Sequence, residues 1–177
     1  MKKAILILML ICATCAYGQR LSVLGIEMGT DIETAEKVLN ERYGEYKVFR
    51  TGNTELRVFD ARVGGSEFRS VSFIFQCARY GNAMYTYLSE VDLQKNFHKH
   101  SDAKSMFNVW EIKLGDKYTF DKIKEYENDS GTANDIYVYY KEGVSLSLSY
   151  GTSKGGELFW YVDVYYYENI INESNDY

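Results

Sequence analysis

Apolar residues recur at helical spacing in two segments of the chain, Asp31–Tyr43 and Asp102–Leu114. The apolar positions are Ile32, Ala35, Leu39 and Tyr43 in the first segment and Ala103, Met106, Trp110 and Leu114 in the second. Apolar residues three and four positions apart form one face of an α-helix. The pattern therefore predicts two amphipathic helices, each with one face directed at a core.

The two predicted helices belong to a weak internal repeat. Thr30–Phe49 aligns with Ser101–Phe120 at an offset of 71 positions, which places Asp31 on Asp102 and Gly44 on Gly115. Strand-like sequence follows each segment. A sequence that recurs at a fixed offset indicates one supersecondary unit used twice.

The ends of the predicted helices carry capping residues. Thr30 begins a capping box with Glu33, whereas Ser101 is followed three positions later by Lys104. We therefore expect the first backbone N–H groups of the first helix to be better supplied with hydrogen-bond acceptors than those of the second. Gly44 and Gly115 are expected to end the helices in the left-handed conformation.

Most of the remaining sequence alternates between apolar and polar residues, which is typical of β-strands. The predicted strands are Tyr46–Arg50, Glu55–Val63, Glu67–Cys77, Met84–Leu93, Ile136–Lys141, Val144–Tyr150 and Leu158–Tyr167. Glycine-containing turns as short as Gly64-Gly65 require antiparallel neighbours. The prediction is an α+β fold: an antiparallel sheet with both helices packed on one face, built from two lobes, 19–97 and 98–177, that share one sheet.

A helix of the form T-D-I-E-T-A-E-K-V-L-N-E-R-Y-G, followed by an antiparallel meander and used in tandem, resembles the β-lactamase-inhibitor-protein fold. It is also similar to the single-copy BamE-type envelope lipoproteins and to small exported proteins of Bacteroidota. The disulfides of the inhibitor proteins and the lipobox of the assembly lipoproteins are absent. The resemblance implies a recognition sheet presented to a protein partner, and it assigns no binding residue.

The first 18 residues have the pattern of a secretory signal peptide. Lys2 and Lys3 precede an apolar run that ends at Cys15, and Ala16 and Gly18 occupy the small-residue positions of a cleavage site. Neither Cys12 nor Cys15 follows the small residue that a lipobox requires, so cleavage is favoured over lipid anchoring. The predicted location is periplasmic or extracellular, without a membrane span.

Charge and cysteine content narrow the range of functions. The whole chain carries 20 basic and 25 acidic residues, a net charge of −5, which becomes −7 without Lys2 and Lys3. Nucleic-acid binding requires a basic surface, and this balance argues against it. Cys77 is the only cysteine after the leader, so no internal disulfide is expected.

A candidate binding face follows from the strict alternation of Val144–Tyr150. Its serines alternate with apolar residues, and tyrosines occupy the corresponding positions of the neighbouring strands. The predicted face consists of Tyr137, Tyr139, Ser145, Ser147, Ser149, Tyr161 and Tyr165. Tyrosine combines a large contact area with a polar tip and serine adapts its hydrogen bonds, so this face can bind a protein. The alternative is a solvated sheet without a partner.

Catalytic and metal sites have weaker support. His98 and His100 would project to one side of an extended chain, with Asp102 as a conceivable third ligand, but no further histidine or cysteine pair completes a zinc site. Cys77 ends a strand that is expected to be buried, where it would pack as a small apolar residue. The segment Asn128–Asp135 lacks the residue order of a calcium loop. No metal and no cofactor is predicted.

Three functional classes remain. An exported, non-catalytic protein that binds a protein partner through the sheet face is the first prediction. The second is an accessory protein of envelope assembly. The third is a metal-dependent or cysteine hydrolase, which would require a pocket that converges on His98, His100 or Cys77.

Overall fold

The computed structural model describes residues 21–80, 83–127, 134–152 and 155–167. The predicted signal peptide, 1–18, and most of the loop Asn128–Asp135 lie outside these ranges. The described chain is an α+β fold with helices α2 (Ile32–Tyr43) and α3 (His100–Gly115) and a single large antiparallel sheet. Helix α2 is followed by a short 3-10 helix, η1 (Glu45–Lys47).

The large sheet has eight strands in the order β3-β4-β5-β6-β10-β9-β8-β7. Their bounds are Val48–Thr51 (β3), Glu55–Val63 (β4), Ser66–Tyr80 (β5), Ala83–Phe97 (β6), Phe120–Glu127 (β7), Asn134–Tyr140 (β8), Val144–Thr152 (β9) and Leu158–Tyr167 (β10). Because β6 pairs with β10, one sheet runs through both predicted lobes.

One face of the sheet forms the core. A single row of paired residues crosses six strands through Val58, Val71, Leu93, Val164, Leu146 and Val138. All six are at most 1% exposed. Period-two alternation places these side chains on the same side, as the sequence pattern predicted.

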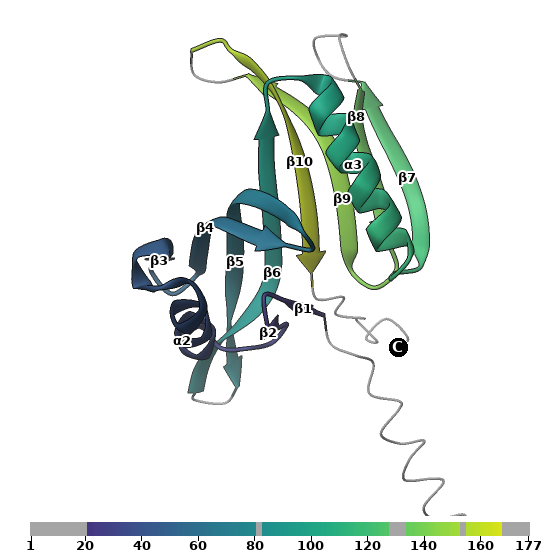
Figure 1. The fold of residues 1–177 in the computed structure, drawn as a ribbon. Coiled ribbons are helices and arrows are strands. Elements are labelled where there is room, and N and C mark those ends of the chain that lie inside the picture. Colours follow the sequence, from purple (N-terminus) through teal and green to yellow (C-terminus); the bar gives the residue numbers. More distant parts are fainter. Residues whose placement is uncertain (1–20, 81–82, 128–133, 153–154, 168–177) are drawn as a thin grey trace, which may run out of the picture.

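Both helices cover this apolar face (Figure 1). Helix α2 buries Ile32, Ala35 and Leu39, and α3 buries a stripe of its own, made up of Ala103, Phe107, Trp110 and Leu114. These residues join the sheet residues in one core. A short hairpin of β1 (Ser22–Val23) and β2 (Ile26–Glu27) adds further apolar residues at the edge of this core.

The predicted strands agree with the structure in kind and mostly in extent. The predicted bounds of β4 and β10 are identical to the observed ones, while β5 and β6 are longer than expected. The prediction missed β7, whose eight residues are all exposed, and the two-residue strands of the N-terminal hairpin. Cys77 was wrongly expected to be buried: β5 continues past it, and Cys77 is exposed together with Gln76 and Arg79.

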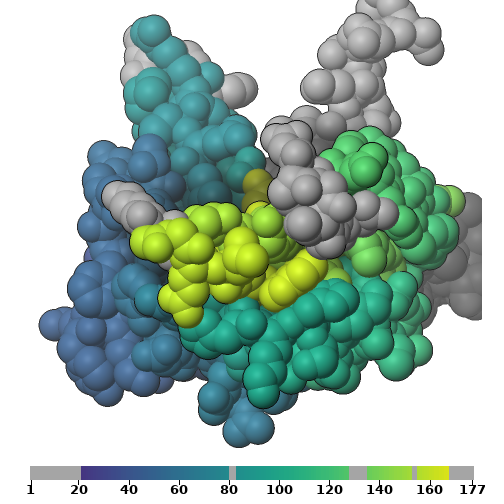
Figure 2. Space-filling view, turned by 90° about the horizontal axis from the view of Figure 1, so that it is seen from above, coloured from purple at the N-terminus to yellow at the C-terminus, as the bar shows by residue number. Residues whose placement is uncertain are grey.

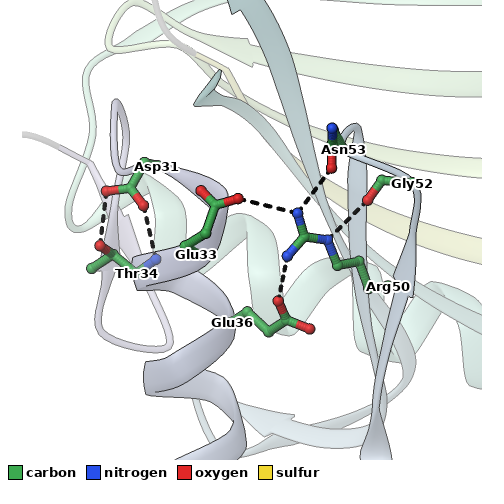
Figure 3. Close-up of polar contacts among 7 residues, drawn as sticks. All are labelled: Asp31, Glu33, Thr34, Glu36, Arg50, Gly52 and Asn53. Atoms are coloured by element: carbon green, nitrogen blue, oxygen red, sulfur yellow. Dashed lines mark hydrogen bonds and ion pairs between the residues drawn. The ribbon is translucent and has the colours of Figure 1, made fainter. Parts of the chain in front are cut away.

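The capping box predicted for the first helix is wrong by one position. Asp31, not Thr30, is the N-cap of α2, and its carboxylate accepts bonds from the Thr34 amide at 2.9 Å and the Thr34 hydroxyl at 2.8 Å (Figure 3). Acceptance of these bonds lowers the pKa of Asp31. Glu33 instead pairs with Arg50 on β3, which also bonds Glu36 at 2.6 Å.

The second helix begins without a side-chain cap. Its N-cap is Lys99, which makes no capping bond, and the Ser101 hydroxyl donates to the neighbouring Asp102 carboxylate. The structure therefore confirms that the first backbone N–H groups of the first helix are better supplied with hydrogen-bond acceptors than those of the second. Neither glycine ends its helix in the expected left-handed conformation: Gly44 caps α2 with a positive φ of 84° but a ψ of 146°, and Gly115 remains helical, with Asp116 as the C-cap of α3.

Gly64 in the turn between β4 and β5 allows α3 to approach the sheet. Its φ is 55°, and a Cβ at this position would lie 3.0 Å from the ring of Trp110. The indole packs edge-on against Phe68 with ring centroids 5.4 Å apart, and its N–H donates to Ser66 at 3.1 Å. The turn therefore anchors the second helix to the first half of the sheet.

Candidate binding face

The second face of the sheet is covered by neither described helix. Its residues alternate with the core residues along each strand, and we call it the uncovered face. Its central rows are Arg57, Ser72, Asp92, Tyr165, Ser145 and Tyr139, then Ser70, Gln94, Asp163, Ser147 and Tyr137, then Asn96, Tyr161 and Ser149. Figure 2, seen from above, shows the hairpin of β5 and β6 and the green strands β7 and β8 on the side of the molecule away from α3.

All seven residues predicted for the binding face lie together on it. Tyr137 pairs with Ser147, Tyr139 and Tyr165 both pair with Ser145, and Tyr161 pairs with Ser149. The rings of Tyr137 and Tyr139 are nearly parallel, with centroids 6.5 Å apart. The Lys122 ammonium lies 5.5 Å from the centroid of the Tyr139 ring.

The serines are less accessible than the sequence suggested. Ser149 is 0% exposed and Ser147 is 8% exposed, whereas the four tyrosines are of intermediate exposure. The Ser149 hydroxyl donates to the Tyr137 hydroxyl at 3.4 Å. Tyrosine side chains on the neighbouring strands β8 and β10 cover the short serine side chains of β9. The tyrosines therefore form the outer surface of this face, and the serines lie beneath them.

Two carboxylates occupy the centre of this face, and neither belongs to the seven residues predicted for binding. Asp92 on β6 pairs with Tyr165, and Asp163 on β10 pairs with Gln94, so the aspartates are diagonal neighbours on adjacent strands. Burial raises the pKa of Asp92 to about 6, against the opposing effect of the Arg57 charge. Burial and the charge of Asp92 raise the pKa of Asp163 to about 7.

A local signal for these aspartates is present in the sequence. Each stands between two apolar residues of an alternating strand, as Val91-Asp92-Leu93 and Val162-Asp163-Val164. The signal does not show that they are neighbours, because β6 and β10 are distant in sequence and only their pairing brings the two together.

Hydrogen bonds organise the side chains around the carboxylates. The Tyr165 hydroxyl donates to Glu90, and burial together with this bond raises the pKa of Tyr165. Arg57 donates from Nε to Glu55 at 3.1 Å and to Ser72 at 3.2 Å. Burial also raises the pKa of Tyr161, so these phenols remain neutral hydrogen-bonding groups near neutral pH.

The predicted histidine and cysteine chemistry lies elsewhere in the fold. His98 is 3.3 Å from Glu157 and lines a pocket of about 600 Å³, while His100 begins α3 with its ring centroid 4.2 Å from that of Trp160. Cys77 pairs across β5 and β6 with Thr86 and is not among the residues that line this pocket. The part of the chain that the structure describes contains no cluster of three or more side chains suited to hold a metal.

Comparisons with known proteins give no further assignment. No family model matches the chain, and no match was found among curated proteins or solved structures. None of the described helices has the length and apolar character needed to cross a membrane.

Proposed function

We propose that the protein is an exported, non-catalytic binding protein that recognises a protein partner through the uncovered face. The observation that carries this proposal is the grouping of Tyr137, Tyr139, Tyr161 and Tyr165 on the side of the sheet away from both helices. Tyrosine is enriched at energetically dominant interface positions, because its ring buries a large area at small entropic cost.

We also propose that the fold arose by duplication, in the manner of the β-lactamase-inhibitor proteins. The order of strands is symmetric about the β6 and β10 pair, and each half consists of a helix followed by four strands. Leu39 and Trp110, which align in the sequence repeat, are 0% and 3% exposed. Export is proposed from the leader sequence of Met1–Gly18.

The test begins with the chain from Gln19 onwards as bait in envelope extract, followed by titration of the partner that it recovers. Tyr139→Ala and Tyr161→Ala should each weaken binding by about 1–2 kcal/mol and barely change stability. Leu146→Ala, at a core position, should instead lower the free energy of unfolding by about 2–5 kcal/mol.

Tyr46→Ala is the matched control. Tyr46 is 78% exposed and lies in η1, outside the uncovered face. Its removal should change neither affinity nor stability appreciably. Retention of full affinity by both face variants, or an equal loss in the Tyr46 variant, would show that the partner binds elsewhere.

A further inference from the structure

The two central aspartates of the uncovered face have unsatisfied hydrogen-bonding capacity. Oδ1 of Asp92 and Oδ1 of Asp163 are both inaccessible to solvent and have no hydrogen-bond partner among the described residues. A buried polar atom without a partner is costly, and two neighbouring carboxylates also repel each other. Gln94 makes a side-chain hydrogen bond to Asp163, but the two Oδ1 atoms have no donor, and no positively charged group is bonded to the pair among the described residues.

The cation on the β4 side does not fill this role. Arg57 acts on Asp92 through its charge, and its hydrogen bonds go to Glu55 and Ser72 instead. Lys122 and Lys124, on β7, lie instead over the ring of Tyr139. The carboxylate pair thus has cations around it and none bonded to it among the described residues.

Ser147 gives a second and independent indication. It lies between Asp163 and Tyr137 in its row and is only 8% exposed. No hydrogen bond of its hydroxyl is found in the described part of the chain. The Ser147 hydroxyl lies beside the Asp163 carboxylate, and its oxygen can accept a further hydrogen bond from the same group that bonds the carboxylate.

We propose that Asp92 and Asp163 receive the guanidinium group of an arginine side chain from a protein partner, and that the tyrosine side chains beside them move aside to admit it. A guanidinium has five donors in a planar fork, which suits two carboxylates, and it can lie against the neighbouring tyrosine rings. A neutral donor would leave the repulsion between the aspartates in place. Calcium would require six or more oxygen ligands, and the described residues contain no metal cluster. This inference rests on the proposed function of the uncovered face.

Several other charged or titratable groups face the pair. They are Arg57 on β4, Glu90 on β6, Tyr161, Tyr165 and Tyr167 on β10, and Tyr137 and Tyr139 on β8. The facing residues of β5 and β9 are serines, Ser70 and Ser72 on the one and Ser145 and Ser147 on the other. Deprotonation of the aspartates near pH 6 to 7 is therefore the titration expected to control cation binding in this range.

The test uses Nα-acetyl-arginine-N-methylamide as the probe and the neutral citrulline analogue as its isostere. NMR titration of the carbon-labelled aspartate carboxyl groups reports where the probe binds. Saturable shifts are expected at Asp92 and Asp163, with affinity about tenfold higher at pH 8 than at pH 5. The citrulline analogue should bind at least about tenfold more weakly.

The double variant Asp92→Asn and Asp163→Asn keeps the shape of the site and should lose the binding and its pH dependence. Equal binding of arginine and citrulline probes, shifts confined to other carboxyl groups, or unchanged affinity of the double variant would each overturn the inference. The experiments distinguish failure of the guanidinium site from failure of the binding function proposed for the uncovered face. Loss of partner affinity in the tyrosine variants but not in the double aspartate variant would retain the binding face and reject the guanidinium site.

Discussion

At the scale of single residues, the most consequential feature is a pair of carboxylates whose Oδ1 atoms folding removes from water without supplying hydrogen-bond donors to them. The pKa of Asp92 is about 6 and that of Asp163 about 7, both above the ordinary value for aspartate. Such sites oppose stability when ionised, and proteins retain them where they serve binding or chemistry. The pair therefore links the stability of the fold to the function proposed for its face.

The pH dependence of stability follows from this pair. Between about pH 4 and pH 7 the folded state binds more protons than the unfolded state, so the free energy of unfolding should fall as pH rises through this range. Asp163→Asn removes one of the two groups. It should raise the free energy of unfolding at pH 8 by about 1–3 kcal/mol and change it little at pH 4, as measured by urea unfolding. Parallel profiles for the parent and the variant would contradict the assignment.

At the scale of elements, local sequence chemistry decides how each helix starts. Asp31 caps α2 with two bonds to Thr34, whereas α3 begins without a side-chain cap. Aspartate at the N-cap also interacts favourably with the helix dipole. The first helix should therefore depend on one side chain at its start more than the second helix does.

Asp31→Ala should lower the free energy of unfolding by about 1 kcal/mol, whereas Thr30→Ala should have a much smaller effect. Thr30 is the suitable control because it precedes the cap and its side chain makes no capping bond to α2. Chemical denaturation of both variants measures the difference. A larger loss of free energy of unfolding in the Thr30 variant would instead support the capping box of Thr30 and Glu33 that the sequence predicts.

The sequence predicts elements well where one face is buried and poorly where none is. Both helices and the strands that contribute to the core follow from their apolar periods, and the bounds of β4 and β10 agree fully. Strand β7 lacks a buried side and so gives no clear alternation. The Asp92 and Asp163 pair escaped prediction because it depends on strand pairing across the two halves, which local pattern does not encode.

At the scale of the whole molecule, one sheet carries two faces with different roles. Both helices and the N-terminal hairpin gather over the apolar face, which forms the single core. The opposite face carries tyrosines, buried serines and the central aspartates, grouped over β8, β9, β10 and β6. This division lets the second face vary its chemistry without loss of core packing, which is the arrangement expected of a binding scaffold.

Hydroxyl-radical footprinting of the complex with the recovered partner tests the central claim most directly. It reports the accessibility of each tyrosine in the free and the bound protein. The account predicts strong protection of Tyr137, Tyr139, Tyr161 and Tyr165 on binding, with Tyr46 labelled equally in both states. Unchanged labelling of the four face tyrosines in a saturated complex would contradict the claim that the uncovered face is the binding surface.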